Sequence, residues 1–286
     1  MRGAVHDAPG LVVVATPIGN LSDMSGRALE ALRGADLVLC EDTRTTARLL
    51  QHYGVSVRTE ALHDHNEAGR VPGILARLQG GARVALVSDA GTPLVSDPGY
   101  RLVQATVAAG VRVSAVPGPN AAVMAVVLSG LPPQPFLFLG FPPPRQAARL
   151  AAFGRLRAVE RAGLVATLVW HEAPHRLAEM LADLASAFGD RPAAVARELT
   201  KRFEEVRRGA LPVLAAHYAE EAARGEITVV VGPGPEEGGD AEDLDGMLLR
   251  ALAGGSVKDA AAVVAGATGL PRKVVYARAL ELGRPE

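Results

Sequence analysis

The stretch SDAGTPLVSDPGYRLVQATVAAGVRVSAVPGPNA, residues 88–121, decides the fold of this chain. It follows the apolar run 84–87, and a continuous apolar run that stops at turn residues predicts a buried parallel strand ending in a loop. Residues 100–109 then predict a helix that Gly110 ends, and the apolar run 111–116 predicts a second strand. This strand, helix, strand unit places both loops at the carboxyl ends of strands, where open α/β sheets bind ligands.

The composition is that of a well-packed globular protein, because 49% of the residues are hydrophobic and only 21% are charged. A formal net charge of -1 gives no overall electrostatic case for a nucleic-acid partner, so any polyanion site has to be a local patch. The single cysteine, Cys40, ends an apolar run and is expected in the core, which excludes a disulfide within the chain. The apolar run 11–15 is too short for a signal peptide, and no run is long enough to span a membrane. We therefore expect a cytoplasmic protein that needs no metal.

Three more apolar runs, at 11–15, 35–40 and 57–61, predict strands, and Ser25 is expected to cap a helix over 26–33. Polar or turn-forming residues follow each run, in the segments TPIGNL (16–21), EDTRTT (41–46) and HDHNE (63–67). Because the carboxyl ends of parallel strands meet at one edge of a sheet, these clusters predict a site there.

We expect the chain to divide into an N-terminal α/β domain (1–131), a C-terminal α/β domain (132–235), a linker (236–243) and a helical tail (244–286). The first boundary falls where Pro132 and Pro133 break a predicted helix. The linker is rich in glycine, proline and acidic residues. Three short helices are predicted in the tail, and their arrangement around a glycine-containing turn suggests a helix-turn-helix.

A basic helix is predicted after the proline run 142–144. Its charged residues are Arg145, Arg149, Arg155, Arg157 and Arg161 against a single acid, Glu160. Such a run is consistent with a solvated helix face or with a surface that contacts a polyanion. The sequence leaves both alternatives open.

Several common site types are excluded. No predicted strand is followed by the dinucleotide-binding glycine pattern or by a Walker A loop, and no nucleophile elbow is present. His171 and His175 have the spacing of a zinc protease, but Pro174 lies between them and the segment follows a strand rather than lying on a helix. What remains is a site of small-residue loops with acids, amides and hydroxyls, suited to a ligand without a pyrophosphate.

A set of segments spread over nearly the whole chain resembles the tetrapyrrole methylase superfamily. The segments are ATPIGNL (15–21), CEDTR (40–44), HNE (65–67), SDAGTPLVSDPG (88–99), VPGPNA (116–121), HEAPHR (171–176) and RELTKRFEE (197–205). The closest resemblance is to the branch of the superfamily that methylates a cytidine ribose 2′-oxygen in the decoding region of small-subunit ribosomal RNA. The resemblance implies a two-domain α/β fold of the non-Rossmann methyltransferase type with a small helical tail. It also implies a homodimer, S-adenosylmethionine (SAM) between the domains, and ribosomal RNA or the assembled 30S subunit as partner.

The resemblance also implies which residues contact SAM: Pro17, Asp89, Gly91, Thr92, Val95, Asn120, Ala121, Trp170 and Leu199. In corrinoid relatives the central loop has an aspartate between glycine and proline, whereas this chain has Thr92 there. That departure favours the RNA-modifying branch.

Methyl transfer to a ribose hydroxyl needs a general base or a charge that stabilises the developing alkoxide, because the hydroxyl is a weak acid. The candidates are Asp42, His65, Glu67 and Glu172, and the candidates for RNA contact are Arg44, Arg197, Lys201 and Arg202. An alternative for the segment 41–44 is an ion-pair network that only shapes the site. Two other functions remain open: methylation of a tetrapyrrole, corrinoid or other small substrate, and a non-catalytic RNA-binding role in ribosome assembly.

Overall fold

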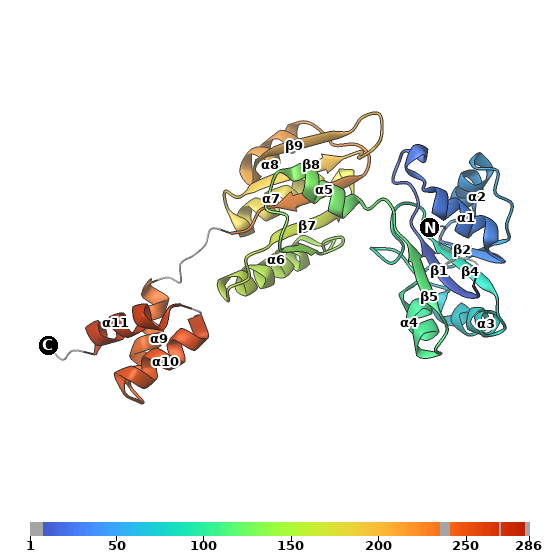
Figure 1. Ribbon diagram of the computed structural model, residues 1–286. Helices are drawn as coiled ribbons and strands as arrows, with labels where there is room; N and C mark the ends of the chain where they lie inside the picture. Colours follow the sequence, from blue (N-terminus) through green and yellow to red (C-terminus); the bar gives the residue numbers. More distant parts are fainter. Residues whose placement is uncertain (1–7, 235–240, 269, 284–286) are drawn as a thin grey trace.

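The computed structural model describes residues 8–234, 241–268 and 270–283, and Figure 1 shows two α/β domains followed by a helical tail. The strands of the first domain are β1 (Gly10–Val14), β2 (Leu37–Cys40), β3 (Thr59–Ala61), β4 (Arg83–Val87) and β5 (Val113–Val116). They form a five-stranded sheet in the order β3-β2-β4-β1-β5, in which every pairing is parallel. The predicted strands are confirmed, and the polar clusters that follow them lie at one edge of the sheet.

Helices cover both faces of this sheet. They are α1 (Gly26–Gly34), α2 (Thr43–His52), α3 (Glu67–Gln79) and α4 (Tyr100–Ala108). Along β1, Val12 and Val14 belong to the core under α1 and α2, whereas Leu11 belongs to the core under α3 and α4. Strands buried on both faces are apolar at consecutive positions, which is why they appear as unbroken apolar runs. Each fully buried aliphatic side chain stabilises the fold by about 1.5–3 kcal/mol.

The second sheet is mixed. Its strands are β6 (Phe136–Phe138), β7 (Thr167–Glu172), β8 (Pro192–Arg197), β9 (Glu205–Ala210) and β10 (Ile227–Val231), in the order β6-β7-β10-β8-β9. The pairing of β6 with β7 is parallel, and the other pairings are antiparallel. Helices α6 (Gln146–Arg161), α7 (Leu177–Phe188) and α8 (Leu211–Glu220) cover one face, and their core includes Trp170 and Phe153.

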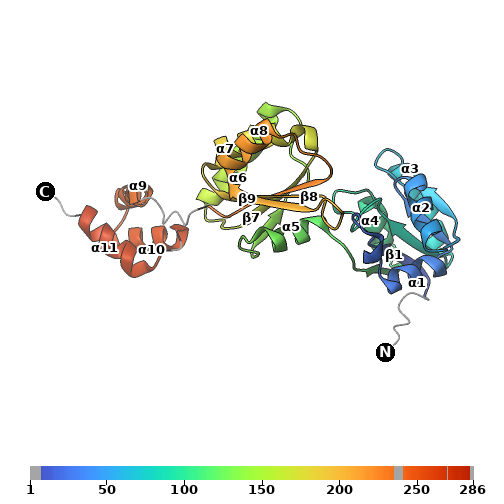
Figure 2. The ribbon, with the colours of Figure 1, turned by 90° about the horizontal axis from the view of Figure 1, so that it is seen from above.

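Helix α5 (Ala121–Ser129) covers the opposite face of the second sheet, as Figure 2 shows. Ala122, Ala125 and Val126 of α5 pack in one cluster with Val169 of β7 and Val230 of β10. The helix follows β5 of the first sheet directly in the chain, yet it completes the core of the second sheet. The division that we place at residue 131 is therefore crossed by this packing.

The tail forms a unit of three helices, α9 (Ala241–Leu252), α10 (Val257–Thr268) and α11 (Arg272–Leu282). Leu248, Val264 and Val275 belong to its own small core. Helix α9 begins inside the segment predicted as a linker, and residues 236–240 of that segment lie outside the described part of the chain. In the described part, no helix has the length and apolar character needed to cross a bilayer.

Candidate functional site

The loop after β4 forms the first wall of the site, and it is tied to the loop after β1. Thr16 and Gly91 pair through two backbone hydrogen bonds, of 2.8 and 3.1 Å, and the Thr16 hydroxyl donates to the carbonyl oxygen of Ser88 at 3.2 Å. Gly91 has a φ of +82°, and a Cβ there would lie 3.2 Å from Cγ2 of Ile18. Only glycine adopts this backbone conformation without strain, so the close approach of the two loops depends on Gly91.

Left-handed backbone conformations occur at non-glycine residues in the loops of both domains. Leu94 and Ser96 have φ values of 71° and 67° in the loop after β4, and Glu198 and Thr200 have values of 51° and 68° in the loop after β8. Each such residue costs on the order of 1 kcal/mol, which the surrounding structure has to offset. Backbone strain of this kind clusters at functional sites, so these loops are candidates for one.

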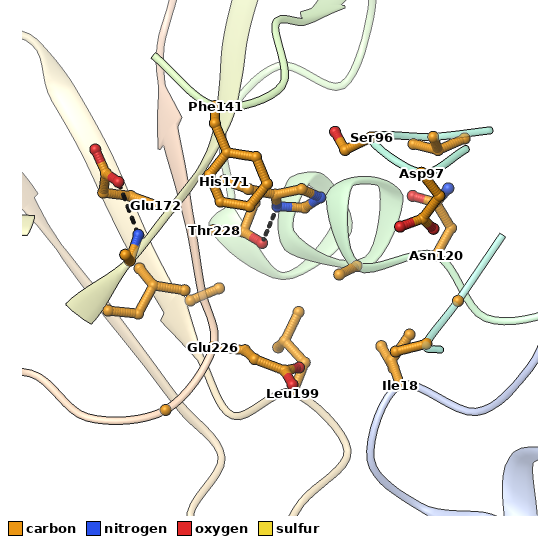
Figure 3. Close-up of a pocket in the computed structure, with 18 of the residues that line it drawn as sticks. Ile18, Ser96, Asp97, Asn120, Phe141, His171, Glu172, Leu199, Glu226 and Thr228 are labelled. Atoms are coloured by element: carbon orange, nitrogen blue, oxygen red, sulfur yellow. Dashed lines mark hydrogen bonds between the residues drawn. The ribbon is translucent and has the colours of Figure 1, made fainter. Parts of the chain in front are cut away.

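A cavity of about 360 Å³ lies between these loops, and we call it the first cavity (Figure 3). Asp97 and Asn120 come from the first domain, and Phe141, His171 and Thr228 come from the second. Its lining further includes Ile18, Gly91, Thr92, Val95, Ala121, Glu172, Leu199, Gly225 and Glu226. Both domains are therefore needed to form the cavity.

The first cavity is acidic. Asp97 and Glu226 line it, the side chain of Glu172 is fully buried in its wall and points away (Figure 3), and none of the described residues that line it is lysine or arginine. Burial lowers the pKa of His171, so the imidazole is neutral near pH 7, and its Nδ1 lies 3.0 Å from the Thr228 hydroxyl. A cavity with carboxylates and no cationic side chain suits a positively charged ligand better than a phosphate.

The three carboxylates differ in their partners. Glu172 pairs with Arg176 at 2.9 Å, and Glu226 pairs with Lys201 at 3.2 Å. Burial, followed by repulsion from Glu41, raises the pKa of Asp97 to about 6, although a hydrogen bond with Ser88 opposes the rise.

A second cavity, of about 320 Å³, adjoins the first and shares Ile18, Ala90 and Glu226 with it. Its other lining residues are Thr16, Pro17, Gly19, Leu21, Thr45, Thr46, Arg48, Leu49, Ser88, Asp89 and Lys201. Arg48 and Lys201 give this cavity the cationic side chains that the first one lacks. The arrangement is an acidic cavity beside one that contains cations.

The structure brings most of the predicted cofactor residues together. The predicted residues that line the first cavity are Gly91, Thr92, Val95, Asn120, Ala121 and Leu199. Pro17 and Asp89 line the second cavity instead. Trp170 lines neither: its ring is 2% exposed and packs against Phe153 and Phe188 in the core of the second domain.

Of the predicted catalytic residues, Glu172 alone is among those that line the first cavity. Asp42 caps α2 by accepting the backbone N–H of Arg44, and hydrogen bonds with Arg44 lower the pKa of its carboxyl to about 2. Glu67 is 3% exposed and accepts the backbone N–H of Leu102 at 3.0 Å, so its carboxylate ties α3 to α4. His65 is exposed on the loop before α3.

The predicted RNA-contacting residues carry ion pairs or a ring contact in the described structure. Arg44 is exposed and pairs with Asp42, and Arg197 pairs with Glu205. Lys201 pairs with Glu198 at 2.9 Å as well as with Glu226. Arg202 lies over the ring of Phe203, 5.5 Å from its centroid.

Two arginines of the basic helix form ion pairs within the second domain. In α6, Arg149 is fully buried and pairs with Asp183 at 2.6 Å. Arg157 pairs with Glu160, which also binds Arg191 of the same domain. Both predictions for this helix, a solvated face and a contact with a polyanion, are therefore wrong for Arg149, because its guanidinium does not reach the surface.

Sequence reasoning missed Asp97, Phe141 and Thr228 as lining residues. Asp97 lies inside the 88–99 segment, so a signal was present, but nothing distinguished it from the neighbouring acids. Thr228 lies within an apolar strand, where a hydroxyl residue carries no signal of its own.

The family model "Tetrapyrrole (Corrin/Porphyrin) Methylases" matches residues 10–215, and the model "RsmI C-terminal HTH domain" matches residues 238–283. Two similar proteins are both named ribosomal RNA small subunit methyltransferase I. The one from Mesorhizobium japonicum is 49% identical and covers 96% of this chain and 92% of its own length. The one from Pseudomonas aeruginosa is 46% identical and covers 95% of this chain and 96% of its own length.

Solved structures share the fold at lower sequence identity. Diphthine synthase superposes with a TM-score of 0.58 at 18% identity, over 78% of this chain and 90% of its own. The methyltransferase CobJ superposes with a TM-score of 0.57 at 20% identity, over 79% of this chain and 94% of its own. At such identities the likeness shows the fold alone.

Proposed function

This chain belongs to the tetrapyrrole (corrin/porphyrin) methylase family, and we propose that it methylates small-subunit ribosomal RNA, at the 2′-oxygen of a cytidine ribose in the decoding region. The family predicted from the sequence motifs is thereby confirmed, and with it a methyltransferase activity. Two matches support RNA as the substrate: the curated relatives named as ribosomal RNA methyltransferases, and the tail model. Because ribosomal RNA is cytoplasmic in bacteria, the proposal also places the reaction in the cytoplasm.

The observation that carries the proposal is the pair of adjoining cavities with different charged residues: the first has carboxylates and no described lysine or arginine, and the second has Arg48 and Lys201 beside Asp89 and Glu226. SAM is a sulfonium cation with an ammonium group, and the first cavity offers carboxylates without any described lysine or arginine in its lining. The second cavity adds Arg48 and Lys201, which suit the phosphates of an RNA strand. We therefore assign the first cavity to the methyl donor and the second to the nucleotide that accepts the methyl group.

The residues of the first cavity fit SAM. Gly91 and Gly225 both have a φ of +82°, and a Cβ at Gly225 would overlap the side chain of Glu198. The two glycines thus allow protein groups to pack closely in the walls of the first cavity. Ile18 and Leu199 offer apolar surface, and Asn120 and Thr92 offer polar groups. When bound, SAM supplies an activated methyl group and a neutral leaving group.

The contribution of the protein is then mainly to position the acceptor oxygen, to exclude water and to accept a proton. Arg48 and Lys201 would orient the RNA backbone, and the exposed Arg44 and Arg202 extend the cationic surface on the two domains. Arg197 belongs to this proposal as well, although its side chain pairs with Glu205. Single phosphate contacts of this kind weaken with salt, so the affinity for RNA should fall as ionic strength rises.

A homodimer is part of the proposal, and an exposed face of α5 supports it. Val123, Met124 and Val127 are 44%, 38% and 63% exposed, although the other side of the same helix is buried in the second domain. A helix that is apolar on all sides is normally covered on all sides. A second copy of the chain would cover this face.

The test uses tritiated SAM with small ribosomal subunits from a strain that lacks this protein, and with naked RNA in parallel. The labelled RNA is digested to nucleosides and the labelled nucleoside is identified. Label in 2′-O-methylcytidine is the expected result. Normal SAM binding by calorimetry without label in either RNA would refute the RNA proposal and favour a small-molecule substrate. No SAM binding at all would favour the non-catalytic RNA-binding alternative.

A further inference from the structure

We propose that Asp97 is the general base of the reaction, the group that takes the proton from the acceptor hydroxyl. The inference rests on the proposed function and deepens it by naming a catalytic residue. It starts from three observations: the position of Asp97 in a loop that lines both cavities, the missing cationic partner of its carboxylate, and the acids that surround it.

Asp97 lines the first cavity and belongs to a loop that lines both cavities. Ser88, Asp89 and Ala90, earlier in the same loop, line the second cavity, and the charge of Asp89 acts on the Asp97 carboxyl. The left-handed backbone at Ser96 and the glycine at position 99, with a φ of +120°, fix the turn that carries it. A Cβ at Gly99 would lie 2.6 Å from Cδ2 of Leu86, so this turn is packed directly on β4. The carboxylate is thus held in the wall of the first cavity by a rigid loop that also lines the second.

Asp97 is also the carboxylate of the first cavity that has no ion-pair partner among the described residues. Glu172 and Glu226 are each held by a cation, Arg176 and Lys201 respectively. A paired carboxylate is a weaker base, because transferring a proton to it means giving up the ion pair. Asp97 carries no such penalty.

The acids around Asp97 make it a better base than the other aspartates nearby. Burial and the carboxylates of Glu41, Asp89 and Asp64 raise the pKa of Asp97 to about 6. Of the second-domain residues at the first cavity, His171 is neutral and Glu172 is paired with Arg176. Neither therefore adds a positive charge that would lower the pKa of Asp97. A base works best when its pKa lies just below the working pH, since it is then ionised and still has affinity for a proton. Asp42, with a pKa of about 2, fails this requirement.

The proposed step balances in atoms and charge. The acceptor oxygen forms a bond to the methyl carbon while the hydroxyl proton goes to a carboxylate oxygen of Asp97. The electron pair of the carbon–sulfur bond leaves with the sulfur, which becomes a neutral thioether. The proton on Asp97 is then released to solvent before the next turnover.

The experiment compares wild-type protein with Asp97→Asn, Asp97→Glu and Glu41→Gln, using small subunits from the deletion strain. Single-turnover methyl transfer is measured between pH 5.5 and 8.5, and SAM affinity is measured by calorimetry for each variant. We expect Asp97→Asn to lose about 10²–10⁴-fold in rate with unchanged SAM affinity, and Asp97→Glu to recover part of it. Glu41→Gln should keep the plateau rate and move the acidic limb of the profile to lower pH, because it removes a neighbouring negative charge.

Two results would overturn the inference. One is an Asp97→Asn variant that keeps both the rate and the acidic limb of the wild-type profile. The other is a loss of SAM affinity that accounts for the whole loss of rate, which would make Asp97 a cofactor contact. Failure of the proposed function is distinct from both: wild-type protein would then bind SAM and label no RNA.

Discussion

Replacing Arg149 with methionine would leave the carboxylate of Asp183 buried without its partner. The Arg149 side chain is 0% exposed, its Nε donates to Asp183 at 2.7 Å, and a second nitrogen lies 2.6 Å from the same carboxylate. Breaking a buried pair by removing one member costs about 3–5 kcal/mol. At about 2–4 °C per kcal/mol, we expect the melting temperature to fall by something on the order of 6–20 °C.

Scanning calorimetry measures this, with two further variants for comparison. Arg155→Met changes an exposed arginine of the same helix and should alter the free energy of unfolding by no more than about 0.5 kcal/mol. The double variant Arg149→Met, Asp183→Leu removes both charges and should recover most of the lost stability, since an apolar pair of similar volume packs well in place of a buried ion pair.

RNA affinity is the second measurement on the same proteins. A structural role predicts that Arg149→Met, assayed well below its melting temperature, binds RNA like wild type. The reasoning would be refuted by a variant that melts like wild type and binds RNA more weakly, because Arg149 would then have to act at the surface.

Three further outcomes are expected. The folded-state pKa of Asp97 lies above its ordinary value of 3.8, so ionisation of its carboxyl destabilises the fold as pH rises from about 4 to 6. Asp97→Asn should therefore raise the free energy of unfolding at pH 7 by about 1–2 kcal/mol, after allowing for solvent screening, and leave it unchanged at pH 3. Urea titrations at the two pH values measure this. Gly225→Ala places a Cβ against Oε1 of Glu198 at a φ of +82°, so it should lower both the melting temperature and the SAM affinity. A SAM affinity equal to that of wild type, measured by calorimetry, would count against the assignment of the first cavity to the methyl donor. Val127→Asp puts a charge on the exposed face of α5 and should convert the proposed dimer to a monomer in sedimentation velocity. A variant that is still dimeric would place the interface elsewhere.

The sequence predicts the scaffold well because local patterns determine it. Ser25 caps α1 by accepting the N–H of Ala28, as its position before the helix indicates, and the unbroken apolar runs give the parallel strands of the first sheet. Strand β9 escapes prediction because its segment, EVRRGA, is polar and only half-buried at a sheet edge. Its place depends on pairing with β8, which no local pattern encodes.

The site is harder to predict because its properties come from residues that are distant in sequence. The pKa of Asp97 depends on Glu41 and Asp64, which the fold brings to the same sheet edge. Glu67 belongs to a polar segment typical of a surface loop, yet its carboxylate is buried against the first turn of α4. The resemblance to a family predicted most of the loop residues that line the first cavity. Only the folded structure shows which of the carboxylates there are ion-paired and which one is not.

The packing of α5 has a consequence for how this protein can be cut into pieces. A fragment starting at residue 132 would lack the helix that covers Val169 and Val230, and one face of its sheet would be bare. A large bare apolar face promotes aggregation. A fragment starting at Ala121 would keep that cover. A C-terminal domain that is to be expressed alone or exchanged between proteins should therefore begin with α5.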